Sequence, residues 1–343
     1  SPYILTGNIQ VSSGASLTID PGVEIDLNGN FIHVNGTMRA EGTESSKISI
    51  TGTAATNEGN FILFNQNSTP YTTSNTGSMI DHAIVYTNPK GGAGIPGYSS
   101  NGAIHGHFTQ DEGPKISNST ITSLNGSAIK LTSSSGIISN NILQAPGTVL
   151  QANGTYSAKS VTNNVILGGS QGFYCNVGPP ETFEYNMFIG NGSGTGLGLG
   201  CTSGLTLSYN LIYGYSKAIE LSGTWSSTGF TINNSSFINN AHHITTLQGE
   251  VLIDLTNNWW GLTTSNAIED TIFHNPDDFR FSTVDFDPFL TSPSTSAPVS
   301  PPQNVAAQTG PTTIALTWDS NPESDIAGYK VHYDTDAAGY PYA

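Results

Sequence analysis

The phrase I-S-N-N-I-L at residues 138–143 recurs, with small changes, six more times in the chain. The other copies are I-S-N-S-T-I at 116–121, V-T-N-N-V-I at 161–166, F-E-Y-N-M-F at 183–188, L-S-Y-N-L-I at 207–212, I-N-N-S-S-F at 232–237 and L-T-N-N-W-W at 255–260. Its fourth position is always Asn or Ser, at Ser119, Asn141, Asn164, Asn186, Asn210, Ser235 and Asn258, and these residues lie 22 to 25 apart. A repeat this regular predicts a stack of near-identical structural units between Ile116 and Gly261.

Units of this length fit two architectures, the leucine-rich repeat and the coil of a parallel β-helix. A leucine-rich repeat needs leucines at fixed offsets and a helix in each unit. The units here are instead rich in Gly, Ser, Thr, Asn and β-branched residues, without apolar residues at helical spacing. Short strands joined by turns therefore fit better. Because neighbouring coils lie about 4.8 Å apart, the recurring Asn is expected to form a ladder of side-chain amides.

The composition excludes several classes of protein. Charged residues make up 10% of the 343 residues and 39 residues are Gly, so neither a helical bundle nor a charged disordered tail fits. Nine Lys and Arg against 25 Asp and Glu give a net charge of −16, which argues against nucleic acid and other polyanions as partners. No apolar run approaches the roughly 20 residues of a membrane span, so no such span is predicted.

A second strand in each coil separates two faces by its alternation. The aligned segments are A-I-H-G-H at 103–107, A-I-K-L-T at 128–132, V-L-Q-A-N at 149–153, F-Y-C-N-V at 173–177, L-G-L-G-C at 197–201, A-I-E-L-S at 218–222 and H-I-T-T-L at 243–247. One column, expected to point inward, holds Ile104, Ile129, Leu150, Tyr174, Ile219 and Ile244. The next column, expected to face solvent, holds His105, Lys130, Gln151, Cys175, Leu199, Glu220 and Thr245.

Residues 17–51 carry a more specific signal. L-T-I-D-P-G-V-E-I at 17–25 is followed by V-N-G-T-M-R-A-E-G-T at 34–43 and K-I-S-I-T at 47–51. These segments resemble the opening coils of secreted right-handed parallel β-helix proteins, the pectin-lyase-like superfold. The resemblance implies that the first coils begin the stack and cover its open end.

The segment after Trp260 changes character. N-N-W-W-G at 257–261, D-D-F at 277–279 and V-D-F-D-P-F-L at 284–290 are similar to the closing segment of many bacterial and archaeal β-helix surface proteins. The apolar spacing within Asn266–Phe273 predicts a short capping helix. Residues 1–290 are therefore interpreted as an all-β unit, a right-handed parallel β-helix solenoid of about a dozen coils with N- and C-terminal caps.

Two further segments follow the predicted β-helix. T-S-P-S-T-S-A-P-V-S-P-P at 291–302 is interpreted as an extended Pro/Ser/Thr linker. Residues 303–343 resemble the first strands of a fibronectin type III domain, an immunoglobulin-like β-sandwich, with Trp318 and Tyr329 at the family's core positions. Because such a sandwich needs about 100 residues, this segment is interpreted as part of one. Its open strand edge predicts self-association with a neighbouring subunit by strand addition.

His105, Lys130 and His107 form the best candidate catalytic group. The two histidines lie two residues apart on one strand face, and stacking would place Lys130 roughly 5 Å from His105. That is close enough to lower the pKa of the lysine and make it a proton-abstracting base for polysaccharide β-elimination. Further titratable residues nearby in the sequence are His82, Asp111 and Glu112. The alternative interpretation is a polar outer strand without catalysis.

The resemblance implies what such an enzyme would look like. Many pectin-lyase-like proteins cleave acidic polysaccharides, using clustered aspartates for hydrolysis or a Lys or Arg base for elimination, often with calcium. None of those motifs is matched residue for residue in this sequence. No role of the family is therefore carried over to a residue of this chain.

Four carboxylates near the end of the β-helix are candidate calcium ligands, because calcium takes oxygen ligands. They are Asp277, Asp278, Asp285 and Asp287. The alternative gives these residues turn and N-cap roles. No other cofactor is predicted, and the adjacent His242 and His243 are expected to point to opposite faces rather than share a metal.

Two smaller features leave alternatives open. Cys175 and Cys201 either stack on neighbouring coils as a disulfide or remain buried thiols. Four aromatic residues form either an outward sugar-stacking strip or part of the core and turns: Tyr209, Tyr213, Tyr215 and Trp225.

These features favour an extracellular structural or adhesive protein, secreted or displayed on the cell surface, as part of a larger surface protein or fibre. Secretion is inferred from the protein class, and a polysaccharide or cell-surface glycan is the expected partner. The alternatives are a polysaccharide lyase or hydrolase acting on the outer face of the β-helix, and a non-catalytic glycan-binding module. An enzyme is expected to gather its titratable residues over two or three coils, and a rod to spread them thinly.

Overall fold

The computed structural model describes residues 2–91, 101–107, 113–132, 135–153, 159–176, 178, 180–200, 205–221, 231–246 and 252–331. The chain divides into two compact units, Ser1–Pro298 and Val299–Ala343. The first unit is the parallel β-helix predicted from the repeat, and it consists of three parallel sheets in which successive coils each add a strand. The second unit is described separately below.

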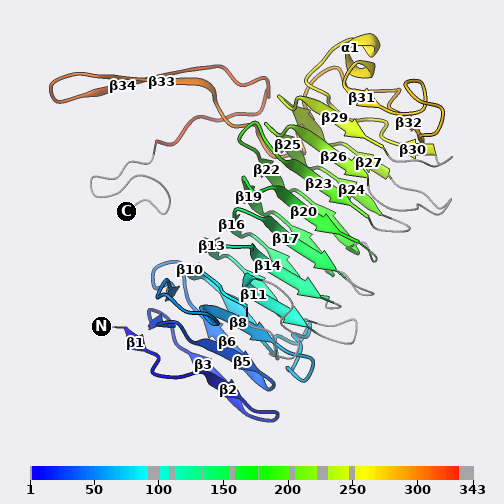
Figure 1. Ribbon diagram of the computed structural model, residues 1–343. Coiled ribbons are helices and arrows are strands. Elements are labelled where there is room, and N and C mark those ends of the chain that lie inside the picture. The colour runs from blue at the N-terminus through cyan, green and yellow to red at the C-terminus, as the bar shows by residue number, and fades with distance from the viewer. Residues whose placement is uncertain are drawn as a thin grey trace. The chain divides into compact units, whose positions relative to one another are not determined.

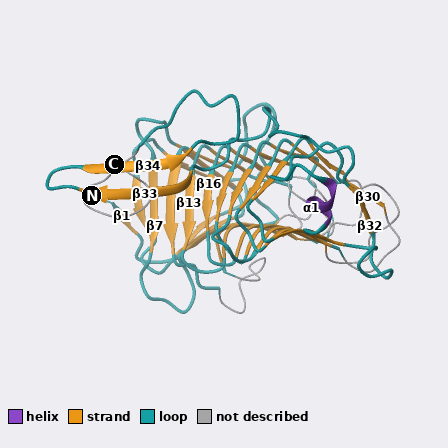
Figure 2. Cartoon of the chain, turned by 90° about the horizontal axis from the view of Figure 1, so that it is seen from above, coloured by secondary structure: helices purple, strands orange, loops and turns teal. Residues whose placement is uncertain are grey.

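Sheet A has ten strands, and several of them lie side by side in Figure 2. Its strands are β1 (Tyr3–Ile4), β4 (Glu24–Asp26), β7 (Ile48–Gly52), β10 (Ala83–Thr87), β13 (Thr120–Ser123), β16 (Ile142–Gln144), β19 (Val165–Leu167), β22 (Met187–Ile189), β25 (Leu211–Tyr213) and β28 (Ser236–Ile238).

Sheets B and C have eleven strands each. Sheet B contains β2 (Ile9–Val11), β5 (Phe31–Val34), β8 (Phe61–Phe64), β11 (Gly102–His107), β14 (Ser127–Thr132), β17 (Thr148–Asn153), β20 (Gln171–Cys175), β23 (Thr195–Leu199), β26 (Lys217–Leu221), β29 (His242–Thr245) and β31 (Ile272–Phe273). Sheet C contains β3 (Ser16–Ile19), β6 (Thr37–Glu41), β9 (Met79–Asp81), β12 (Lys115–Ser117), β15 (Ile137–Ser139), β18 (Ser160–Thr162), β21 (Thr182–Glu184), β24 (Thr206–Ser208), β27 (Thr231–Asn233), β30 (Leu252–Asp254) and β32 (Thr283–Asp285).

The predicted ladder lies at the turn that joins sheet C to sheet A. Asn141 Nδ2 donates to Asn164 Oδ1 at 3.0 Å, and Asn164 Nδ2 donates to Asn186 Oδ1 at 3.0 Å. The same carbonyls accept backbone N–H groups, such as Asn141 N to Asn164 Oδ1 at 3.1 Å. The series continues through Asn210 and reaches Asn258 by way of Ser235. The ladder is confirmed, and it satisfies buried polar groups at one corner of each coil.

The left-handed conformation is adopted by the residue before each of the seven ladder positions and by His82 before Ala83, whose N–H donates to Ser119 Oγ; φ lies between 49° and 59°. These eight residues form the column that we call the left-handed column: His82, Asn118, Asn140, Asn163, Tyr185, Tyr209, Asn234 and Asn257. Asn adopts this conformation more readily than other residues with a Cβ, whereas a bulky residue pays about 1–2 kcal/mol. The two tyrosines and the histidine are therefore the exceptions in this column.

One part of the predicted alignment of sheet B is wrong. Leu150 pairs with Phe173 and Gln151 pairs with Tyr174, so Tyr174 lies in the outer column while Cys175 is buried in the core. Leu199 also belongs to the core rather than to the outer column.

The physical reason for this slip lies in the position of the small residue. Gly172 faces a crowded interior, where an added Cβ would lie 2.7 Å from Gly196 O and from Phe188 Cδ1. This glycine takes the place that Ala103 and Ala128 take in earlier coils. Phe173 is therefore the residue that stacks on Leu150.

The C-terminal end of the stack is closed by α1 (Ser265–Glu269) and by packed aromatic rings. Thr264 caps the helix through its hydroxyl, which accepts from Ala267 N. The helix is shorter than predicted, because Ile272 and Phe273 form β31 and pair with β29. Trp260 is fully buried against Phe237 and Phe286. Figure 1 shows α1 at the end of the stack opposite β1.

Residues 290–298 run back along the outside of sheet A and are called the strap. Leu290 packs against Leu211, Ile238 and Trp259, and its N–H donates to Asn258 O at 2.9 Å. Ala297 is buried. This part of the predicted linker therefore lies against the β-helix within the first unit.

At the N-terminal end of the stack, an apolar hollow of about 340 Å³ opens beside the first coil. Its lining includes Leu5, Ile9, Leu17 and Val23, which are only partly buried. The N-terminal cap stays a prediction.

The second unit contains an antiparallel pair, β33 (Gln303–Thr309) and β34 (Ile314–Asp319). Trp318 and Tyr329 pack edge to face with ring centres 5.0 Å apart, and Glu323 accepts hydrogen bonds from Ser300. A small antiparallel sheet is compatible with part of a fibronectin type III domain. That assignment, like self-association through it, stays a prediction.

Candidate functional site

His105 and Lys130 lie side by side on the outer face of sheet B. β11 and β14 pair in parallel with His105 opposite Lys130 and His107 opposite Thr132, so the predicted neighbours are brought together. His105 Nε2 lies 3.1 Å from Thr132 Oγ1. The expectation of solvent exposure is wrong here, because His105 is 0% exposed and Lys130 is 6% exposed. Of the three further titratable residues, Asp111 and Glu112 lie outside the described residues, and His82 lies at the turn between β9 and β10.

The electrostatics of this group follow mainly from burial. Burial lowers the pKa of His105 to about 3, with smaller contributions from Lys130 and His107. Burial also lowers the pKa of Lys130 and of His107. The predicted lowering of the lysine pKa is therefore present, but its cause is desolvation rather than the neighbouring imidazole.

Burial of the same face extends toward the N-terminus. Phe31 and Phe61 stack with ring centres 4.8 Å apart, and Leu63 packs with them outside the main core. Leu63 is the partner of His105 in β8. A lysine of lowered pKa could abstract a proton, but a polysaccharide needs access to it, and both Lys130 and His105 are buried.

Three of the four candidate calcium ligands, Asp277, Asp278 and Asp285, have other roles within the described residues. Asp277 Oδ2 accepts from His274 N at 3.0 Å, and Asp285 Oδ1 accepts from Asp287 N at 3.3 Å. Hydrogen bonds from Arg280 lower the pKa of Asp278 to about 2. Within the described ranges, no group of three or more His, Cys, Asp or Glu is arranged to hold a metal ion. Calcium binding there stays a prediction.

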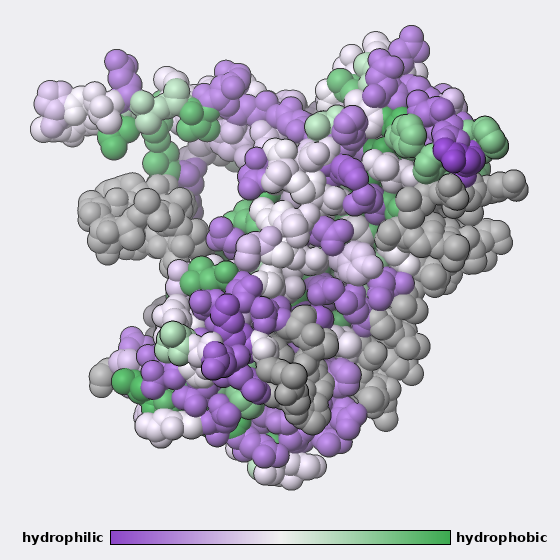
Figure 3. All heavy atoms as spheres, in the orientation of Figure 1, coloured by the Kyte–Doolittle hydropathy of each residue, from purple (hydrophilic) through white to green (hydrophobic). Residues whose placement is uncertain are grey.

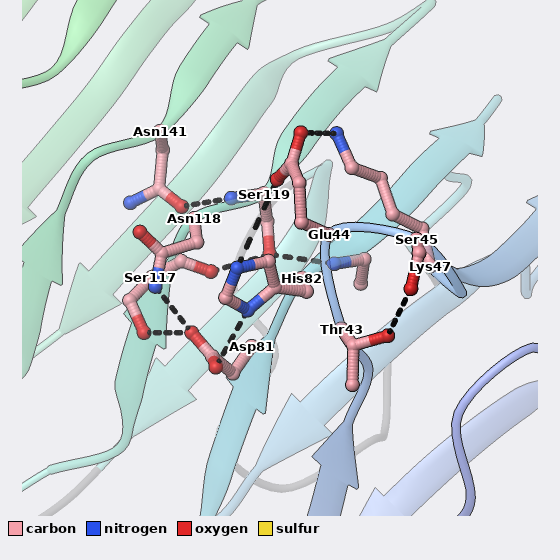
Figure 4. A network of polar contacts seen from close by, with 11 residues as sticks. Thr43, Glu44, Ser45, Lys47, Asp81, His82, Ser117, Asn118, Ser119 and Asn141 are labelled. Atoms are coloured by element: carbon pink, nitrogen blue, oxygen red, sulfur yellow. Dashed lines mark hydrogen bonds and ion pairs between the residues drawn. The ribbon is translucent and has the colours of Figure 1, made fainter.

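A polar network joins three coils near the start of the left-handed column (Figure 4). Asp81 Oδ2 lies 2.8 Å from His82 Nδ1, and Asp81 Oδ1 accepts from Ser117 Oγ and Asn118 Nδ2. Burial alone would raise the pKa of Asp81, but these hydrogen bonds lower it overall. Glu44 Oε2 lies 3.9 Å from His82 Nε2.

This network orients an imidazole with a carboxylate. Its members come from residues 44 to 118. Only the proximity of Asp81 and His82, which are adjacent in the sequence, could be predicted. Ser117 donates to Asp81 and not to His82, so the group lacks the hydroxyl-to-imidazole contact of a nucleophilic triad.

Two tyrosines of the left-handed column stack on each other. The rings of Tyr185 and Tyr209 are 5.1 Å apart at 6°, and Tyr185 is 39% exposed. A groove of about 330 Å³ opens beside Tyr185 and is lined by Asn163, Asn164, Val165, Tyr185, Met187, Ser296, Ala297 and Pro298. Sequence reasoning missed Tyr185, although its place in the third position of the phrase was a usable signal.

The predicted aromatic strip is not assembled as expected. Tyr215 is buried and donates to Gly168 O at 3.2 Å, while Tyr213 packs against the cluster of Leu211, Ile238 and Trp259. Tyr209 belongs to the stack with Tyr185. Trp225 lies outside the described residues.

The remaining predicted features have mixed outcomes. Cys175 is disulfide-bonded, while Cys201 lies outside the described residues. His242 is exposed and His243 is buried against Trp260, so they point to opposite faces as expected. Across the face shown in Figure 3, hydrophilic residues are spread along the coils.

Comparison with known protein families agrees with the coil geometry. Residues 102–260 match the model of the family described as "Right handed beta helix region". This stretch is a right-handed β-helix. The curated proteins gave no significant match, and neither did the solved structures. Among the described residues, no helix has the length and hydropathy needed to cross a membrane.

Proposed function

We propose that the right-handed β-helix is a structural or adhesive rod of an extracellular or cell-surface protein that contacts glycans. The single observation that carries the proposal is the unbroken ladder from Ser119 to Asn258. Each ladder residue before Asn258 bonds to the ladder residue of the next coil, so seven coils are tied along the stack axis. Such a stack resists bending and presents a long, regular surface to a partner.

The distribution of titratable groups supports a rod rather than an enzyme. The predicted catalytic group is His105, His107 and Lys130, and burial lowers the pKa of all three. An enzyme acting on a polymer needs such groups in an accessible cleft. The accessible groove beside Tyr185 is lined instead by amide, hydroxyl and apolar side chains.

The proposal is tested by incubating the purified chain with neutral and acidic polysaccharides. Co-sedimentation measures binding, and reducing ends together with ultraviolet absorbance of unsaturated uronates measure cleavage. We expect binding without cleavage. Multiple turnovers on any of these polysaccharides would contradict the proposal.

A second candidate function, polysaccharide β-elimination, is favoured by the lowered pKa of Lys130 beside His105. In that case Lys130→Met abolishes cleavage of an acidic polysaccharide. Lys217→Met is the matched control, because Lys217 lies on the same sheet and pairs with Glu220. Equal cleavage by the two variants would remove the lyase candidate.

A further inference from the structure

The left-handed column contains residues that suit its backbone conformation and others that do not. Five of its eight residues are Asn, which suits a φ near +55°. Tyr185 and Tyr209 occupy equivalent positions in consecutive coils at φ 58° and 57°. Tyrosine therefore does not stabilise the backbone conformation of these turns. A residue that is unfavourable for the backbone suggests that the aromatic rings themselves have a function.

The ring of Tyr185 has one face packed and one side open. Its partner Tyr209 stacks at 5.1 Å in the next coil. On the other side the column continues with Asn163, whose side chain is exposed. The groove of about 330 Å³ lies there, within the lower part of the range of about 300–1,000 Å³ that holds small ligands.

The walls of the groove combine apolar surface with uncharged polar groups. Val165 and Met187 are neighbours in sheet A and supply the apolar lining. The strap supplies Ser296, Ala297 and Pro298 on the other side. Among the described residues that line the groove, Tyr185 alone is ionisable.

This chemistry fits a sugar ring better than other ligands. A pyranose has a face of C–H groups that packs on the negative face of an aromatic ring, and its edge of hydroxyls bonds to amides and hydroxyls. The uncharged lining and the net charge of −16 disfavour an anionic sugar. We propose that the groove beside Tyr185 is a binding subsite for a neutral pyranose unit of a polysaccharide.

The inference rests on the proposed function, because it names the place where the rod contacts a glycan. Tyr185→Asn is the decisive variant, since it installs the residue that the column prefers and removes only the ring. We expect it to keep or raise the melting temperature. We expect the affinity for soluble neutral oligosaccharides of glucose, mannose or galactose to fall, with a dissociation constant at least about ten times larger. Calorimetry measures this change.

The control is Tyr86→Asn, because Tyr86 has a similar exposure of 42% but lies on β10, away from the groove. It should leave sugar binding unchanged. Oligogalacturonate serves as the acidic probe and should bind more weakly than the neutral sugars. A proline-rich peptide that binds in place of the sugars would overturn the choice of ligand.

The outcomes separate the two proposals. Binding that persists in Tyr185→Asn overturns the subsite and leaves the adhesive rod standing. Absence of sugar binding by the unchanged chain also overturns the subsite. Small-angle scattering then tests whether the chain is a stiff rod. Cleavage of the probes by the unchanged chain overturns the proposed function itself.

Discussion

The ladder turn and the outer face of sheet B use the same stacking geometry in opposite ways. At the ladder, identical neutral amides lie one coil apart and each donates and accepts at once. On sheet B, unlike residues such as His105 and Lys130 lie one coil apart and are buried. Burial there lowers the pKa of both groups and favours their neutral forms. Stacking therefore favours neutral groups that can bond to their own kind, whereas ionisable groups buried by the same stacking lose the stabilisation of their charged forms by water.

The largest expected effect breaks the ladder. Asn164→Ala removes a side chain that accepts from Asn141 and donates to Ile138 O, Thr162 O and Asn186 Oδ1. We expect a loss of about 3–5 kcal/mol in the free energy of unfolding, because buried polar partners lose their bonds. Urea denaturation measures the change.

The control for this prediction is Asn163→Gly, one residue earlier. Asn163 is exposed and Gly adopts its positive φ without strain. This variant should change stability by less than about 1 kcal/mol. Equal losses from the two variants would show that the ladder contributes nothing specific.

Acid should reveal the cost of the buried imidazole on sheet B. The folded-state pKa of His105 is about 3, below the 6.5 of an ordinary histidine. The unfolded chain therefore binds the proton more tightly, and this contribution to stability is complete near pH 7 and falls as the pH drops from about 6.5 toward 3. At pH 4.5 the loss should be about 2–3 kcal/mol.

His105→Gln isolates this contribution, since glutamine does not titrate. The difference in unfolding free energy between pH 7 and pH 4.5 should be smaller in the variant by that amount. Contributions from carboxylates are present in both proteins and cancel. Identical pH dependence of the two proteins would contradict the assigned burial.

A smaller effect tests the register that puts Tyr174 on the outer face. Gly172→Ala places a Cβ 2.7 Å from Gly196 O and Phe188 Cδ1, so we expect a loss of about 1–3 kcal/mol from overpacking. Gly7→Ala is the control, because no heavy atom of the described residues beyond its chain neighbours lies within 4 Å of its added Cβ. Equal melting temperatures of the two variants would contradict the register that places Tyr174 on the outer face.

The smallest effect concerns an exception within the left-handed column. Tyr209→Asn gives up a stacked ring pair, worth about 0.5–1.5 kcal/mol, and relieves a strained tyrosine turn of about 1–2 kcal/mol. The two terms nearly cancel, so the melting temperature should change by only a few degrees. A loss above about 3 kcal/mol would mean that the rings support the fold.

The sequence by itself determined the solenoid, the ladder residues and most of the inward column. Coils that differ by one turn of the stack are neighbours in space, so a spacing of 22 to 25 residues translates directly into contacts between Asn141, Asn164 and Asn186. The pairing of His105 with Lys130 followed from the same rule. The predicted register at Phe173 was wrong, because Gly172 stands where earlier coils have alanine. From the sequence of a single coil, the small residue could not be assigned to one position.

Only the tertiary structure decided which outer surfaces are accessible. The contact of Glu44 with His82 and the strap beside Tyr185 bring together segments with no repeating relation in the sequence. The burial of His105 and Lys130 was likewise visible only in the structure. Periodicity reports what stacks on what, because each coil repeats the last. It carries no information about segments that leave the repeat and return to cover it, and those segments decide where a ligand can bind.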